Sequence, residues 1–220
     1  YFWLPRAYAA STAPVAALFA IMTKVGLYSI IRVYTLIFGD DAGSLANMVQ
    51  DWLWPLALLT LGLGVIGALA AVTLQGLVAY LMVVSVGTLL AGVAIGTPQA
   101  LSAALFYLVH STWVTGGLFL LADLISRQRG EKRGDLVQGP ALQNPHVLGA
   151  MFFMGAIAVA GLPPLSGFIG KLLLLRALEP GLQALFLWPV VLVGGLAMLI
   201  ALSRAGSTLF WRVGRDQLDS

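Results

Sequence analysis

The sequence predicts an all-α integral membrane protein of about six transmembrane helices, and three observations support this fold class. Hydrophobic residues make up 60% of the 220 residues and charged residues only 10%, whereas roughly a quarter of a soluble domain is charged. From Trp52 to Ala122 there are 71 residues without one Asp, Glu, Lys or Arg. Six stretches reach the about 20 apolar residues that a helix needs to cross a bilayer, within one expected transmembrane domain, 1–220. They are 11–38, 52–72, 77–96, 100–126, 146–178 and 183–210.

Short segments with turn residues separate these stretches in order along the chain. An acidic loop at 39–44 ends the first span, and Gln-Gly at 75–76 separates the second from the third. Gly-Thr-Pro at 96–98 precedes the fourth span, and Glu-Pro-Gly at 179–181 precedes the sixth. Glycine and proline at these places are typical of turns. Within the fourth span, the glycine pair at 116–117 favours a mild bend.

The fifth stretch is predicted to be a broken helix. It is about 33 residues long, which is too long for one straight crossing, and it contains Pro163 and Pro164. Proline lacks a backbone donor and disfavours a helical conformation in the residue before it. We therefore expect two half-helices joined by an unwound turn at 161–167, which includes Ser166 and Gly167. Such a turn must be buried in protein or line a wet cavity.

The basic residues predict the orientation of the spans. Counting the spans alternately places every basic residue of the loops and tails on one side of the membrane, and positive loops face the cytoplasm. The sequence therefore predicts a multi-pass protein of a bacterial inner membrane with both ends of this stretch in the cytoplasm. These residues are Arg6, Arg127, Arg129, Lys132, Arg133, Arg212 and Arg215.

Three ionisable residues fall near the middle of their spans. Lys24 lies in the first span, His110 in the fourth, and Lys171 just past the expected break in the fifth. A lysine at the bilayer centre costs about 2.5–3.5 kcal/mol on insertion scales, so it is typical of an ion or proton pathway. Half-helices at mid-depth are also where transporters build ion sites. If the three helices pack side by side, these residues form a lateral proton relay that needs half-channels to each surface.

Hydroxyl groups near these residues could bridge the gaps of such a relay. Tyr28 lies four residues after Lys24, and Tyr107, Ser111, Thr112 and Thr115 lie around His110. A structural explanation stays open for each ionisable residue. A lysine can extend its amine to the interface, although more than a dozen apolar residues separate Lys24 from either loop. Histidine can hold two helices together by hydrogen bonding.

Other chemistry is not indicated by the sequence. There is no cysteine and there are only two histidines, so no thiolate metal site or disulfide is possible and a catalytic metal is not expected. We find no phosphate-binding loop and no nucleophile–base pattern, and we expect no cofactor. A net charge of +3 on membrane-edge loops does not indicate nucleic-acid binding. The chain opens at Tyr1 without a signal-peptide pattern, and we expect it to be a fragment whose upstream part is missing.

Four segments resemble the proton-antiporter membrane family shared by complex I antiporter-like subunits and Mrp-type cation/proton antiporters. Residues 3–28 are similar to the Trp-Leu-Pro segment and lysine-bearing eighth helix of a fourteen-helix subunit, and 108–120 to its broken eleventh helix. The broken twelfth helix is similar to 161–171. The run Leu-Pro-Pro-Leu-Ser-Gly-Phe-Ile-Gly-Lys at 162–171 and residues 203–211 are most similar to the D-type branch of the Mrp antiporter subunits.

The resemblance implies a role for each relay residue. Lys24 would be the central lysine, His110 the connecting group, and Lys171 the terminal lysine, while an upstream glutamate–lysine pair would lie outside this stretch. The sequence departs from many relatives at 75–76, where an acidic-basic run is usual, and at Thr115, where some have lysine.

The function implied is a subunit of a monovalent cation/proton antiporter, which passes protons along this row and exchanges them for Na+ or K+. It is expected to work with the other subunits of a hetero-oligomeric complex and to be a secondary transporter rather than an enzyme. The alternative is a proton-pumping antiporter-like subunit of complex I or of a related membrane-bound hydrogenase. A third interpretation makes the chain a passive scaffold for partner subunits.

Overall fold

The computed structural model describes residues 3–38, 43 and 49–211, and the regular elements of this part are helical. This confirms the predicted all-α class. The helices are α1 Trp3–Ala10, α2 Ala13–Ile37, α3 Gln50–Ala70, α4 Leu74–Ile95, α5 Pro98–Gln128, α6 Pro145–Ala160, α7 Ser166–Arg176 and α8 Leu182–Phe210, with a 3-10 turn η2 at Gly130–Lys132.

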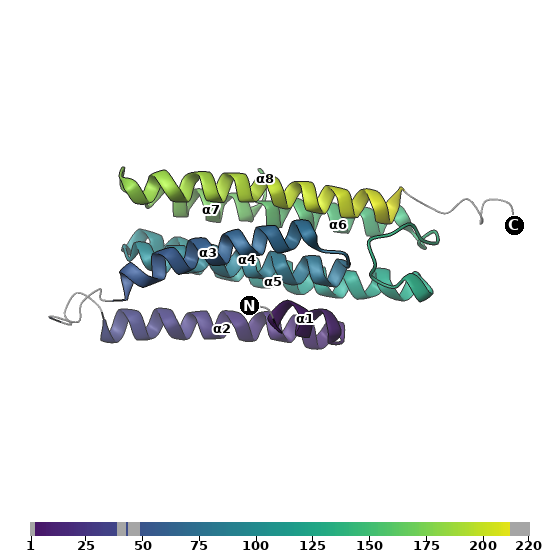
Figure 1. Ribbon diagram of the computed structural model, residues 1–220, viewed down its shortest axis with the longest axis horizontal. Coiled ribbons are helices and arrows are strands. Elements are labelled where there is room, and N and C mark those ends of the chain that lie inside the picture. The colour runs from purple at the N-terminus through teal and green to yellow at the C-terminus, as the bar shows by residue number, and fades with distance from the viewer. Residues whose placement is uncertain (1–2, 39–42, 44–48, 212–220) are drawn as a thin grey trace, which may run out of the picture.

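The helices run roughly along one common axis and form three layers (Figure 1). Helices α1 and α2 lie along one side, α3, α4 and α5 in the middle, and α6, α7 and α8 on the other side. Helix α4 is the centre of the bundle, because all but three of its residues are buried. Glycine permits its close approach to α3: a Cβ on Gly67 would lie 2.1 Å from the ring of Tyr80, and one on Gly87 2.6 Å from the backbone of Leu61.

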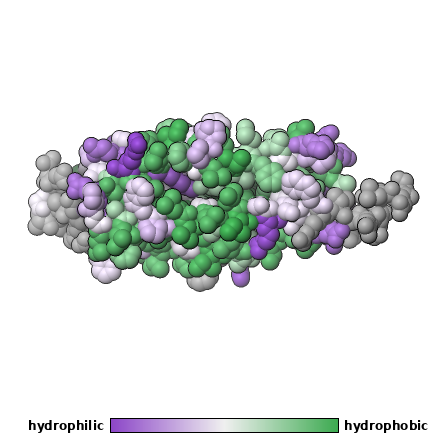
Figure 2. Space-filling model, turned by 90° about the horizontal axis from the view of Figure 1, so that it is seen from above, coloured by the Kyte–Doolittle hydropathy of each residue, from purple (hydrophilic) through white to green (hydrophobic). Residues whose placement is uncertain are grey.

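In the described part of the chain, five helices are long and apolar enough to cross a membrane, and α6 is a shorter apolar helix. Large apolar side chains of α2, α3 and α8 face outward. On the face that carries α8, Figure 2 shows such a hydrophobic surface between the more polar ends of the molecule. In a soluble protein such a surface would be a liability; lipid or neighbouring membrane helices are suited to cover it.

The expected turn residues have identifiable structural roles. Gly96 adopts a φ of +73° and ends α4 in the left-handed conformation that glycine favours. The Thr97 side chain then accepts from the backbone N–H of Ala100 at 3.2 Å, and Pro98 occupies the first position of α5. The fifth stretch is broken as predicted, since α6 ends at Ala160 and α7 begins at Ser166.

The structure differs from the sequence analysis in two helices: one expected break is absent, and one helix was not expected. The resemblance implied a break in the eleventh-helix segment, but α5 is a continuous helix of 31 residues through His110 and Gly116. Its hydrogen bonding is therefore not interrupted there, and that expectation is wrong. Helix α1 was not predicted, because eight residues containing Pro5 lack the length and periodicity of a span.

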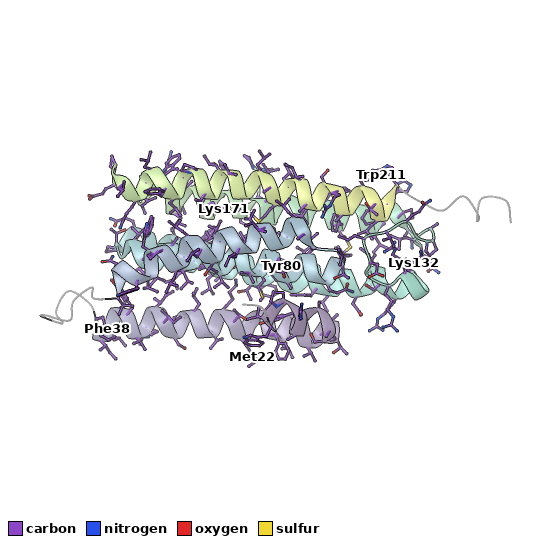
Figure 3. The ribbon with its side chains drawn as sticks, in the orientation of Figure 1. Met22, Phe38, Tyr80, Lys132, Lys171 and Trp211 are labelled. Carbon is purple, nitrogen blue, oxygen red and sulfur yellow. The ribbon has the colours of Figure 1, made fainter. Side chains whose placement is uncertain are left out.

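The segment 129–144 is folded against the α3–α4 connection at one end of the bundle. Arg129 is 1% exposed and donates to the carbonyl oxygens of Arg133, Asp135 and Val137. Backbone bonds then join Leu74 N to the Gly134 carbonyl at 2.7 Å and the Leu136 N–H to the connection. We call this end, where Lys132 is labelled in Figure 3, the basic end. Phe38 marks the opposite end.

Candidate functional site

The three ionisable residues expected at mid-membrane are all buried in the bundle. Lys24 is 2% exposed, His110 8% and Lys171 6%. They come from α2, α5 and α7, so one is contributed by each layer. Lys171 lies about midway between the two ends of the molecule (Figure 3). A buried lysine needs polar partners, and the partners of these residues define the site.

The amine of Lys24 bonds to a hydroxyl of the central helix. Its Nζ donates to Ser85 Oγ on α4, and Ser85 in turn donates to the carbonyl oxygen of Met82 at 2.7 Å. Because the serine proton is engaged with that carbonyl, the hydroxyl is left to accept from Lys24. The contact crosses from the outer layer to the middle layer, so Ser85 is the first polar group that a proton leaving Lys24 would meet.

A second hydroxyl pair continues from α4 to α5. Thr88 lies three residues after Ser85 and donates to the Val84 carbonyl at 3.0 Å, and its side chain interacts electrostatically with that of Tyr107. The ring of Tyr107 lies 5.8 Å, centroid to centroid, from that of His110. Polar groups therefore recur from Lys24 to His110: the Lys24–Ser85 and Thr88–Tyr107 contacts are joined by three-residue steps along α4 and α5, each within one helical turn.

His110 is held between the two halves of the broken helix. Its Nε2 lies 3.2 Å from the carbonyl oxygen of Ala158 at the end of α6, and its Nδ1 lies 2.7 Å from Ser166 Oγ at the start of α7. A carbonyl can only accept, so Nε2 must carry a proton. In the neutral ring Nδ1 accepts from Ser166, and a second proton on Nδ1 requires the serine hydroxyl to turn and accept instead. His110 can thus take up a proton without losing either partner.

Lys171 reaches back from α7 to the end of α6. Its Nζ donates to the carbonyl oxygens of Val159 at 3.1 Å and Ala160 at 2.8 Å. These carbonyls belong to the last turn of a helix, which lacks intrahelical donors and carries partial negative charge. His110 interacts electrostatically with Lys171. The break therefore places His110 and Lys171, the second and third residues of the expected relay, on the same helix end.

Gly167 permits this close packing, and its replacement by alanine is expected to disrupt the site. A Cβ there would lie 2.0 Å from the Ala158 carbonyl oxygen and 2.7 Å from His110 Nε2, so α7 must shift and separate Ser166 from His110. We expect Gly167→Ala to lower transport at least about tenfold, the effect of losing one hydrogen bond of about 1.5 kcal/mol to a charged group. Gly116→Ala is the matched control, since its Cβ meets nothing within 4 Å. Equal transport in the two variants would contradict this role.

The structure places the other predicted residues in different surroundings. Tyr28 is 47% exposed and faces outward, away from the buried amine. The hydroxyls of Ser111 and Thr112 both donate to the carbonyl of Leu108 in their own helix, at 3.1 and 2.7 Å. Thr115 is buried on the same helix. Pro163 and Pro164 lie in the exposed turn of the break.

Ser85 and Thr88 are site residues that the sequence analysis missed. Both are neutral, and neither stands near an ionisable residue in the chain; the available signal was two hydroxyls three residues apart in a span otherwise almost wholly apolar. Among the described residues, no three His, Asp or Glu side chains come together as a metal site would require.

We expect Ser85→Ala to slow proton transfer from Lys24 by about tenfold, because it removes the acceptor of a buried amine and a hydrogen bond of this kind contributes about 1.5–3 kcal/mol. The measurement is the initial rate of cation-driven proton movement in vesicles. Ser29→Ala is the control, since this exposed hydroxyl donates only to the Val25 carbonyl of its own helix. A Ser85→Ala rate equal to that of the control would argue against the bridge.

A cavity of about 430 Å³ opens at the basic end, lined by residues of α1, α2, α4, α5 and the 129–144 segment. Tyr8 forms part of its wall, and the Tyr8 hydroxyl contacts the Phe19 carbonyl and Thr23 Oγ1. Thr23 is the residue before Lys24. Tyr8 and Thr23 thus carry hydroxyl groups from the wall of this cavity to the turn of α2 that contains Lys24.

Residues 1–200 match the family described as NADH:quinone oxidoreductase/Mrp antiporter, transmembrane. The chain is 42% identical over 238 residues to the D component of a probable K+/H+ antiporter of Rhizobium meliloti, covering 96% of this chain and 44% of that protein. It is 45% identical over 172 residues to the D component of a Na+/H+ antiporter of Bacillus subtilis, covering 78% and 34%.

Solved structures give the same result for the fold. The Mrp complex from Dietzia sp. matches with a TM-score of 0.82 and 31% identity, over 97% of this chain and 38% of that one. Respiratory complex I from Thermus thermophilus matches with a TM-score of 0.75 and 27% identity, over 96% and 43%. The chain therefore spans less than half the length of these relatives.

Proposed function

Because this chain belongs to the NADH:quinone oxidoreductase/Mrp antiporter membrane family, we propose that it is part of a subunit that exchanges protons for a monovalent cation. Within it, protons pass along Lys24, His110 and Lys171. The chain would supply the later part of the proton path, and the cation would be Na+ or K+, which the relatives' names include.

The observation that supports this proposal is the series of buried polar groups across all three layers. An amine, two α4 hydroxyls, a phenol, an imidazole and a second amine follow one another from α2 to α7. Buried polar groups that served only stability could be replaced by apolar ones at little cost. A series of groups that can each bind and release a proton is suited to proton transfer.

Coupling along this series would be electrostatic. A positive charge on Lys171 disfavours one on His110, and at short range in a partly dry interior such repulsion is on the order of a few kcal/mol. The row lies across the membrane plane, so it must connect with each surface. We take the cavity at the basic end, whose wall includes Tyr8, as the opening on the Lys24 side. We place this end in the cytoplasm, in a bacterial inner membrane, with further subunits completing the complex.

The test uses the complete complex in sealed vesicles with a pH-sensitive dye. After the vesicle interior has been made acidic, Na+ or K+ added outside should dissipate the pH gradient, without any electron donor, because cation entry and proton exit are coupled. Choline chloride is the control for ionic strength. No response to either cation would refute the antiporter function.

A second candidate is a proton pump powered by redox chemistry, which the match to complex I favours. It uses the same residues but a different source of energy. In the same vesicles it would build a proton gradient only when a reduced electron donor is added, and Na+ and K+ would leave that gradient unchanged. The genes next to this one should then encode dehydrogenase or hydrogenase subunits.

A further inference from the structure

In the last turn of α6, side chains rather than backbone N–H groups donate to the final carbonyl oxygens. The Ile157 carbonyl accepts from the backbone N–H groups of Gly161 and Leu162, both at 3.1 Å. The three carbonyls after it accept from side chains: Ala158 from His110, and Val159 and Ala160 from Lys171. In the described residues, therefore, the amine of Lys171 satisfies two successive carbonyls that the helix itself leaves without donors.

This pair of carbonyls has the chemistry of a monovalent cation site. Its oxygens are neutral, they carry the partial negative charge of a helix end, and backbone carbonyls of this kind replace the hydration shell of K+ in channels. Divalent ions favour sites with carboxylates, and α6 and α7 carry none. The structure already holds one positive group there, since the Nζ of Lys171 lies 2.8 Å from the Ala160 oxygen.

The surroundings of Lys171 limit what else can titrate at this place. Helix α5 presents His110 toward it, and the Tyr107 ring of α5 packs on the neighbouring Gly170, whose added Cβ would lie 2.9 Å from that ring. His146 lies at the end of α6 away from the break, and the guanidinium of Arg204 on α8 donates to the Leu69 carbonyl of α3. On α7 itself Arg176 is five residues away and exposed. His110 is thus the neighbouring base for a proton that leaves Lys171.

We propose that the Val159 and Ala160 carbonyls bind the transported Na+ or K+ and that the protonated amine of Lys171 competes with it. This inference rests on the proposed antiporter function. The ammonium of Lys171 gives its proton to His110 or to water. The neutral amine then moves away or turns its lone pair toward the ion. The cation binds the Val159 and Ala160 carbonyl oxygens in its place. One positive charge leaves as a proton and one arrives as a cation, so the charge of the site is conserved. Proton and cation cannot occupy it together, which is the exclusion that antiport requires.

The experiment measures equilibrium binding of radiolabelled Na+ and Rb+ to the purified complete complex at several pH values. In the unaltered complex, a tenfold rise in proton concentration should weaken the affinity for Na+ or Rb+ about tenfold, since one proton is released for each cation bound. In Lys171→Met the carbonyls remain and their competitor is gone, so binding should persist and lose this pH dependence. Lys171→Gln is a second variant in case the methionine complex does not assemble.

Lys24→Met is the matched control. It removes a buried amine of the same kind, but that amine bonds to a serine rather than to helix-end carbonyls. Transport should be lost while proton-competitive binding remains. Thallium soaked into the Lys171→Met complex should give density beside the Ala160 carbonyl.

Two outcomes separate this inference from the proposed function. If Lys171→Met loses antiport but its cation binding keeps the full pH dependence, or if it binds no cation, the carbonyl site is refuted and the relay stands. If Lys171→Met keeps normal antiport, both the relay role of Lys171 and the cation site are refuted. Thallium density only at other places would likewise overturn the site.

Discussion

Replacing Lys171 by alanine is expected to reduce cation/proton exchange to background, a loss of about 100-fold or more, which corresponds to roughly 2.7 kcal/mol in the barrier. In the proposed relay the Lys171 amine, which bonds to the end of α6, is the last proton-binding group, and alanine offers neither a proton site nor a donor for the Val159 and Ala160 carbonyls. The measurement is the initial rate of gradient dissipation by Na+ or K+ in vesicles that contain equal amounts of complex.

Arg176→Ala provides the control for Lys171→Ala. It removes a positive charge from the same helix, but from an exposed side chain in the last turn, so assembly and rate should change little. A full rate in Lys171→Ala would remove this residue from the path. A loss of similar size in both variants would indicate that α7 needs its charges for assembly, and the relay role would not be supported.

Most of the fold is predictable from the sequence because the bilayer imposes simple rules. An uncharged run from Trp52 to Ala122 admits only helices of membrane length. The Gly96–Pro98 turn and the break at Pro163 follow from residues whose backbone preferences are strong. What failed depended on analogy or on short segments. The break expected in α5 came from relatives, whereas these residues continue the helix, and α1 is too short for periodicity to indicate it.

The candidate site is predictable only in its charged members. A lysine among apolar residues is conspicuous because it is costly, whereas Ser85 and Thr88 cost little in a helix that can bond their hydroxyls to its own carbonyls. Spacing also misjudged Tyr28. The buried stripe of α2 passes through Lys24, Leu27, Ile31 and Tyr34, so the residue four positions on lies outside it. Which face of a membrane helix is buried depends on the helices packed against it, and the sequence does not show those contacts.

Replacing Lys24 by leucine is expected to abolish exchange without destabilising the protein. Leucine inserts into a bilayer more favourably than lysine by about 3 kcal/mol. The change removes only the hydrogen bond that the Ser85 hydroxyl accepts from Lys24, because Ser85 still donates its own proton to the Met82 carbonyl. Transport should therefore fall to background while the unfolding temperature of the complex is unchanged or higher. Rates come from vesicles and unfolding temperatures from heating the detergent-solubilised complex before gel filtration.

This combination separates a relay from a passive scaffold. In a passive scaffold, Lys24 would either contribute to packing or have no role. In the first case Lys24→Leu would lower stability together with transport, and in the second it would leave transport intact. Arg32→Leu, an exposed basic residue two turns further along α2, should leave the rate unchanged. Lost exchange in a complex that is as stable as the original leaves one explanation. The amine is retained, at a cost to insertion, because it binds and releases a proton.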